Sequence, residues 1–112
     1  IGTYDWGGEK AASYLHFDVS GLSGQVVTGA ELKLWNSWSF NCTPSRAWVY
    51  EVTQNWSAQA YWWPGPSYNT SALSHADFAN GWTNCPTQNW ATWELPISNV
   101  QGWVNNRAAS RG

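Results

Sequence analysis

The sequence predicts an all-β domain: an antiparallel β-sandwich of jelly-roll type with one short helix near the C-terminus. Several short segments alternate apolar and polar residues with a period of two, and clusters of Gly, Pro, Asn and Ser separate them. After Pro96 the apolar spacing changes to three and four residues, which is typical of a helix. The 112 residues have the length of one domain and show no internal repeat.

Three strands are predicted in the first half of the chain. In residues 13–20 the apolar members of the alternation are Leu15, Phe17 and Val19. In residues 27–36 Ala30, Leu32 and Leu34 alternate with outward-facing Glu31, Lys33 and Trp35. Residues 46–53 are apolar in both registers, so they predict a third strand whose inward face stays open.

The second half begins with a long aromatic connection without sustained periodicity, residues 54–74. Residues 75–88 predict a short strand followed by a loop. Residues 89–96 return to alternation, with Ala91, Trp93 and Leu95 on the inward face. The helix that follows places Ile97, Val100, Trp103 and Val104 on one stripe, and Ser98 is its predicted N-cap.

The charge content excludes two classes of partner. Only 11% of the residues are charged, the net charge is −2, and the chain has five Lys and Arg residues, too few for a phosphate-binding stripe. We therefore expect no nucleic-acid partner. No apolar run approaches the roughly 18 residues of a membrane-spanning helix, and residues 1–10 lack the pattern of a signal peptide. We expect no membrane insertion, with any export signal outside these residues.

Cys42 and Cys85 are the only cysteines. Their spacing excludes a C-x-x-C redox motif and a metal cluster, so a single disulfide is the preferred interpretation and two free thiols are the alternative. A bond closing a loop of this size would contribute about 4 kcal/mol in the chain-entropy model. A disulfide indicates an oxidising, extracellular setting.

The sequence does not reveal a catalytic site. His16 and His75 have no Ser, Asp or Cys partner at a recognisable spacing, and no acid and base stand out among the carboxylates, so we expect no enzyme activity. Asp5 and Glu9 flank a glycine-containing loop that could hold a structural calcium ion, although a solvated turn is the favoured interpretation. No other cofactor is expected.

Aromatic residues are the most informative feature, because eleven of the 112 residues are tryptophan. A sugar ring presents an apolar face and a rim of hydroxyls, which suits an aromatic plane with uncharged polar neighbours. We assign Trp93 and Trp103 to the core, and Trp56 and Trp63 to a clasp that holds the long connection. Trp35 and Trp90 are candidates for exposure. The predicted ligand-binding residues are Tyr61, Trp62, Tyr68, Trp38, Trp82, Arg46 and Asn84.

A Cys42–Cys85 bond would bring Trp38 and Trp82 together, with Arg46 at the edge. That arrangement describes either an aromatic binding patch or a hydrophobic cluster under the bridge, and packing is the favoured interpretation. Tyr61 and Trp62 have no assignable core role. If a glycan platform lies on the connection, we expect replacement of Trp62 by alanine to weaken binding and leave the melting temperature nearly unchanged.

A resemblance extends over nearly the whole chain. The strings "SYLHFDVSGL", "GAELKLWNSWSFNCTP", "VYEVTQNWS", "WPGPSY" and "WATWELPISNVQGWVNN", in this order, resemble the DNRLRE domain, a β-sandwich module of secreted and surface-attached proteins, most of all its actinobacterial form. The resemblance implies a secreted or cell-surface, non-catalytic protein. Some relatives bind carbohydrate, and others are spacers in large surface or RHS-repeat proteins.

Two functions follow as expectations. The first is a module that binds a polysaccharide by aromatic stacking and hydroxyl hydrogen bonds. The second is a structural or assembly module of a surface protein, filament or toxin precursor. Members of the family usually have an additional strand at each end, so residues 1–112 are expected to be part of a longer precursor and to associate by strand addition with further segments or neighbouring copies.

Overall fold

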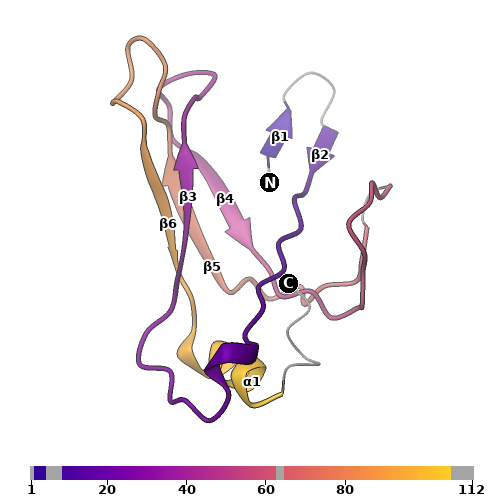
Figure 1. Cartoon of the computed structure of the whole chain (residues 1–112). Helices are drawn as coiled ribbons and strands as arrows, with labels where there is room; N and C mark the ends of the chain where they lie inside the picture. The colour runs from indigo at the N-terminus through magenta and orange to yellow at the C-terminus, as the bar shows by residue number, and fades with distance from the viewer. Residues whose placement is uncertain (1, 5–8, 63–64, 107–112) are drawn as a thin grey trace.

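The computed structural model describes residues 2–4, 9–62 and 65–106, with side chains from residue 12 onward (Figure 1). The elements are β1 (Gly2–Tyr4), β2 (Glu9–Ala11), the 3-10 turn η1 (Ser20–Leu22), β3 (Glu31–Asn36), β4 (Ser45–Val49), β5 (Ser74–Phe78), β6 (Asn89–Glu94) and the helix α1 (Ile97–Asn105). Three antiparallel pairs form, β1 with β2, β3 with β6 and β4 with β5. The predicted all-β class with one short C-terminal helix is confirmed.

The β3–β6 pair has the faces that the sequence predicts. Leu32 lies opposite Trp93 and Leu34 opposite Ala91 on the inward face, while Trp35 lies opposite Trp90 on the outward face. Directly opposed residues of an antiparallel pair share a face, so both registers are fixed by the apolar alternation. The predictions for residues 27–36 and 89–96 are confirmed.

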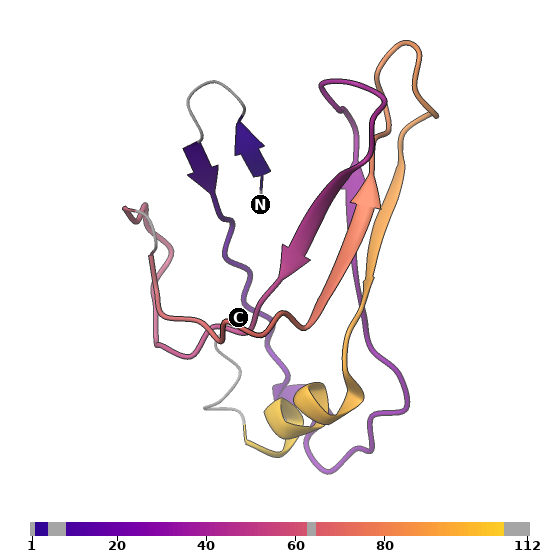
Figure 2. The same cartoon turned by 180° about the vertical axis from the view of Figure 1, so that it is seen from behind.

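The β4–β5 pair packs beside the first, because β5 and β6 lie side by side (Figure 2). The sequence did not decide which face of residues 46–53 points inward. The structure shows that it is the face of Ala47, because this side chain is buried. Ala47, Ala91 and Trp93 form the buried cluster between the two pairs. The Trp93 indole N–H donates to the Ala47 carbonyl at 2.9 Å, and the Phe78 ring packs edge-on against Trp93 at 5.6 Å.

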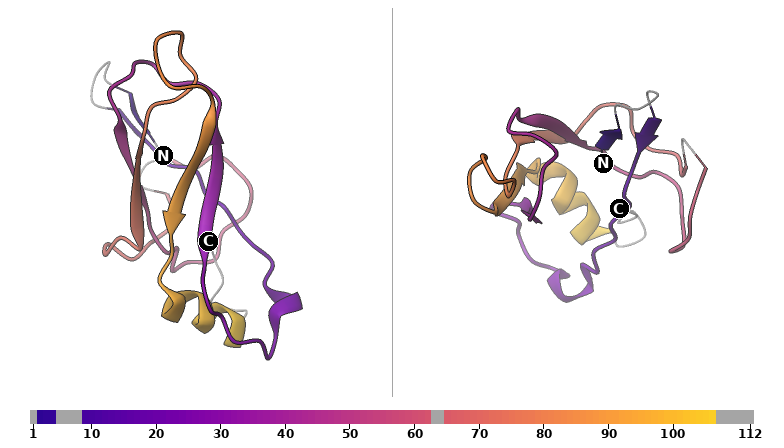
Figure 3. Two further views of the ribbon diagram at one scale, coloured as in Figure 1. Left: turned by 90° about the vertical axis from the view of Figure 1, so that its left-hand side faces the viewer. Right: turned by 90° about the horizontal axis from the view of Figure 1, so that it is seen from above.

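The helix α1 closes the lower end of this core (Figure 3, left). Val104 is buried, and the Trp103 indole N–H donates to the Glu51 carboxylate at 2.7 Å. The prediction of Ser98 as N-cap is wrong. The cap is Pro96, whose extended backbone leads directly into the first turn, so Ser98 lies inside the helix.

No helix in the described part of the chain has the length and hydrophobicity needed to cross a bilayer.

The predicted strand over residues 13–20 is absent. Residues 12–19 carry no regular secondary structure, and η1 begins at Ser20. Val19 is buried, but Leu15 and Phe17 remain exposed. Alternation makes a strand only where a neighbouring strand supplies a ladder, and none of the ladders that the structure describes includes these residues.

The long connection is irregular, as predicted, except for an isolated bridge between Val52 and Tyr68. Trp56 packs against the Tyr14 ring at 5.7 Å, and Gly65, at a φ of +74°, lies so close to the Tyr14 hydroxyl that a Cβ there would clash with it. Trp63, the other half of the predicted clasp, lies outside the described residues. The β1–β2 hairpin was missed, because each strand has only three residues.

Candidate functional site

The predicted disulfide between Cys42 and Cys85 is present, with the two Cα atoms 5.0 Å apart. It joins the loop after β3 to the loop after β5. Gly81, at a φ of +89°, packs so closely on the backbone of Ser37 and Trp38 that any side chain would clash there. The bridge therefore holds both loops at one end of the molecule.

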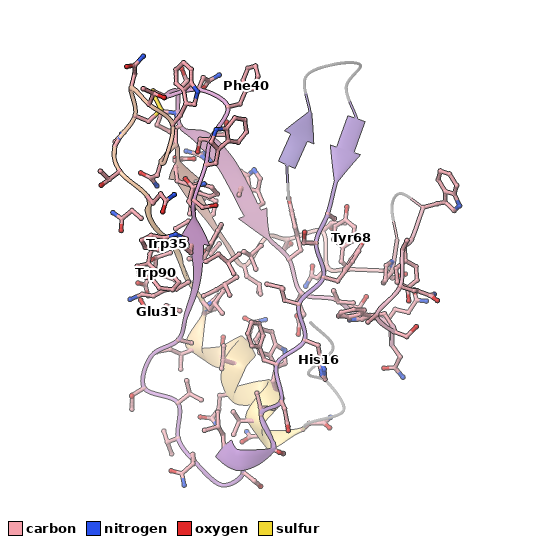
Figure 4. All side chains as sticks on the ribbon, turned by 45° about the horizontal axis from the view of Figure 1, so that its top comes forward. His16, Glu31, Trp35, Phe40, Tyr68 and Trp90 are labelled. Atoms are coloured by element: carbon pink, nitrogen blue, oxygen red, sulfur yellow. A yellow bond between two sulfur atoms is a disulfide. The ribbon has the colours of Figure 1, made fainter. Side chains whose placement is uncertain are left out.

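Three exposed aromatic rings lie on these bridged loops, those of Trp38, Phe40 and Trp82. The Trp38 ring packs edge-on against Phe40 at 6.4 Å, and Figure 4 shows Phe40 at the end of the molecule. Asn84 is exposed in the same loop as Trp82. The bridge thus brings the loops of the predicted residues Trp38, Trp82 and Asn84 together.

Tyr61, Trp62 and Tyr68 lie on the long connection, away from the bridged loops. The Tyr61 hydroxyl accepts from the Ser57 backbone N–H at 3.1 Å, which lowers its pKa. Tyr68 is half-buried, with its ring 5.2 Å from Tyr50. Trp62, in contrast, is 96% exposed. Of the three predicted rings on the connection, Trp62 is the one most available to a ligand.

Arg46 lies on the outward face of the β4–β5 pair, opposite Asp77. Its guanidinium donates two hydrogen bonds to the Asp77 carboxylate, both at 2.8 Å, and lies 5.6 Å from the centre of the Trp48 ring. Trp48 in turn packs against His75 at 4.8 Å. The cross-strand pairing of charges and rings fixes these four side chains in one row.

The hydrogen bonds from Arg46 lower the pKa of Asp77, and those to Asp77 raise the pKa of Arg46. Because the folded-state pKa of Asp77 is depressed, the pair stabilises the protein above the ordinary aspartate pKa of about 3.9 and loses this contribution as pH falls below it. We expect Asp77→Asn to lower the melting temperature at pH 7, with the difference from wild type disappearing near pH 2. Paired melts by circular dichroism at several pH values measure this; a difference that persists unchanged at pH 2 would contradict it.

A groove of about 400 Å³ lies along β5 and β6, and we call it the outer groove. Its lining combines apolar and polar side chains and includes Pro44, Asp77, Asn80, Pro86, Trp90 and Thr92. Trp90, which is 54% exposed, and Asp77 both line the groove, and Arg46, outside the lining, holds the Asp77 carboxylate. An aromatic plane and a fixed carboxylate in one groove suit the apolar face and the hydroxyls of a sugar ring.

Trp35 is not among the residues that line the outer groove, but it contacts the lining residue Trp90. It is 49% exposed, and its ring meets Trp90 edge to face at 5.2 Å (Figure 4). Lys33 and Glu31 continue the same face as an ion pair at 3.2 Å. The face therefore offers two rings in a row followed by charged groups.

Sequence reasoning expected Trp35 and Trp90 to be exposed but did not join them to Arg46. The groove depends on β5 lying beside β6, and the alternation within each strand carries no information on that contact. The charged and aromatic residues at alternate positions of each strand were the available signal, since Arg46 and Trp48 on β4 lie opposite Asp77 and His75 on β5.

The predicted calcium ligands are not tested by the structure, because Asp5 and the side chain of Glu9 lie outside what it describes. Among the described residues no three His, Cys, Asp or Glu side chains cluster in a way that could hold a metal ion.

One comparison with known proteins is informative. The sequence model of carbohydrate-binding module family 96 matches residues 2–95, which include all six strands. No curated protein and no solved structure matches the chain.

Proposed function

Because the chain belongs to carbohydrate-binding module family 96, we propose that it binds a polysaccharide in the outer groove, without catalysing a reaction. The observation that carries this proposal is the exposed Trp35–Trp90 pair beside the Arg46–Asp77 pair. A sugar ring stacks its apolar face on Trp90, while its hydroxyls donate to the Asp77 carboxylate and accept from the Arg46 guanidinium. Trp35 extends the platform to a neighbouring sugar unit.

The shape of the groove supports a chain-like ligand over a small isolated one. It is an open groove of about 400 Å³, and the Trp35 ring contacts Trp90 just beyond its lining. Pockets for whole small molecules are closed clefts that bury most of the ligand. An open groove on a sheet leaves both ends of a polysaccharide free to continue.

The presence of a single carboxylate, Asp77, among the residues that line the groove also supports a binding role. Hydrolysis of a glycosidic bond ordinarily requires two carboxyl groups on either side of the bond. Asp77 is the carboxylate among the residues lining the groove, and its partner is a guanidinium. The arrangement suits hydrogen bonding to hydroxyls better than acid catalysis.

The family and the disulfide together suggest an extracellular protein. We propose the secreted or surface-attached location on these grounds. The finer assignment to the DNRLRE domains is supported by the order of the motifs quoted above.

Tryptophan fluorescence titration against soluble neutral and acidic polysaccharides tests the proposal. We expect at least one polymer to shift the emission of the wild-type protein, and Trp90→Ala to weaken its binding about tenfold, since an aromatic contact contributes about 0.5–1.5 kcal/mol beyond the area it buries. The melting temperature should change little, because the ring is exposed. Absence of a shift with every polymer at millimolar sugar would remove the proposal.

Trp62→Ala is the matched control. It removes the same side chain from a 96% exposed position outside the groove. We expect binding to be retained, because Trp62 is not among the residues that line the groove. Loss of binding in Trp62→Ala with retention in Trp90→Ala would place the site on the long connection instead, which is one of the two regions where the sequence predicted ligand-binding residues.

A further inference from the structure

Two exposed aromatic rings lie together on the disulfide-bridged loops, outside the outer groove. Phe40 is 74% exposed and Trp38 is 59% exposed, and the two rings meet edge to face with their centres 6.4 Å apart. We call this ring pair the loop platform. Neither ring lines the outer groove, and neither belongs to the buried core. Adjacent exposed rings, unlike single scattered ones, are typical of a binding surface.

The backbone beneath the loop platform is held by side-chain hydrogen bonds and by the disulfide. The Asn36 amide group donates to the Trp38 carbonyl at 2.9 Å and accepts from the Asn80 backbone N–H at 2.8 Å. The Ser39 hydroxyl donates to the same amide group at 3.1 Å, and the disulfide joins the two loops a few residues further on. A ring on a fixed backbone loses little conformational entropy when it binds. The loop platform is therefore prepared for a ligand.

The hydrophilic side chains on these loops are uncharged. Residues 34–45 and 78–93 contain no Asp, Glu, Lys, Arg or His, and their hydrophilic side chains are those of Asn, Gln, Ser and Thr. Asn41, Thr43 and Asn84 are exposed on the two bridged loops. Such side chains bond to hydroxyls without the cost of burying an ion, and aromatic rings cover the apolar face of a sugar. The composition of both loops thus suits a glycan.

The bridged loops are continuous with the outer groove. Pro44 and Pro86, which line the groove, belong to the same two loops as the rings. Trp38 follows Trp35 by three residues, so their Cα atoms lie within about 11 Å of each other. Figure 4 shows Phe40 at the end of the molecule, beyond Trp35. A polysaccharide that lies in the groove therefore has the loop platform within the reach of a few further sugar units.

We propose that the loop platform is a second contact for the same polysaccharide: one sugar unit stacks on Trp90 in the outer groove, and a later unit of the same chain stacks on Trp38 and Phe40. This inference rests on the proposed function, because it concerns the continuation of a chain that the groove already holds. The second contact is intramolecular, so it adds affinity without a second free ligand. The recognised unit is then a run of several sugars, and a disaccharide fills only the groove.

Titration calorimetry with disaccharides and hexasaccharides of the cello-, xylo-, manno- and alginate series tests the loop platform. In at least one series we expect the hexasaccharide to bind about tenfold more tightly than the disaccharide. Trp38→Ala and Phe40→Ala should each weaken hexasaccharide binding about fivefold and leave disaccharide binding unchanged. Trp90→Ala should weaken both. Trp62→Ala is the matched control, since it removes an exposed ring from the long connection, and it should weaken neither.

The outcomes separate this inference from the proposed function. Hexasaccharide binding that weakens in Trp90→Ala but in neither loop variant would overturn the loop platform and leave the groove as the glycan site. Equal affinity for both lengths would overturn it as well, and the rings would then serve another partner, such as a protein. Absence of binding in every series would overturn both proposals.

Nuclear magnetic resonance of the wild-type protein gives a second measurement. The indole N–H signal of Trp38, identified by its loss in Trp38→Ala, should shift on addition of the hexasaccharide and stay in place with the disaccharide. Phe40→Ala keeps the test decisive if Trp38→Ala does not fold, because the Phe40 side chain is 74% exposed and its removal leaves the core intact. A Trp38 signal that does not move while the hexasaccharide binds would contradict the second contact.

Discussion

Replacing Trp93 by alanine is expected to destabilise the protein by about 3–5 kcal/mol, the usual cost of removing a buried tryptophan side chain. Trp93 is 3% exposed, and the other members of its buried cluster are Ala47 and Ala91. The indole is therefore the one large side chain of this buried cluster, and partly buried neighbours such as Leu32, Val49 and Phe78 pack around the cluster. Its removal also leaves the Ala47 carbonyl without the N–H that bonds it at 2.9 Å.

Urea unfolding followed by circular dichroism measures this loss. Trp93→Phe is the matched control: it keeps an aromatic ring beside Phe78 but loses the N–H, so we expect a smaller loss than for alanine. Because small domains are stable by only about 5–15 kcal/mol, Trp93→Ala should retain little cooperative unfolding. A loss below about 1 kcal/mol would mean that neighbouring side chains collapse into the space.

The inward faces of the strands are the part of the fold that the sequence predicts well. The strand alternation around Leu32 and Trp93 identified the inward faces correctly. The chain has no methionine, and its buried cluster combines alanines with one tryptophan. Each of these predictions depends on neighbours within one strand or across one pair. That information is present in the sequence at short range.

The predictions that failed depend on contacts between distant segments. Residues 13–20 have a stronger alternation than β4, but β4 is a strand because β5 lies beside it. The outer groove likewise forms where β5 lies beside β6, so that Asp77 and Trp90 belong to one lining. Local pattern decides which face of a strand is apolar, and tertiary pairing decides whether the strand exists and what its polar face meets.

The disulfide is the part of the candidate site that the sequence predicted most directly, since two cysteines in turn-like settings have one possible pairing within the chain. The disulfide affects the outer groove because residues next to the two cysteines line it. Pro44 and Pro86, which line the outer groove, come two residues after Cys42 and directly after Cys85. The bridge therefore holds one end of the proposed glycan site as well as the two aromatic loops.

Replacing both cysteines by serine is expected to destabilise the protein by about 4 kcal/mol, because the bond closes a loop with a sequence separation of 43 residues and restricts the unfolded chain accordingly. For a domain of this size the melting temperature should fall by about 15 °C. Calorimetry of the double variant measures the loss, and wild-type protein melted with a reductant should match it.

If the variant still folds, its glycan affinity should also fall, since Pro44 and Pro86 are no longer held together. A change in melting temperature below about 4 °C would show that the hydrogen bonds of Asn80 with Asn36 and Ser39, at 2.8 and 3.0 Å, hold the loops without the bridge.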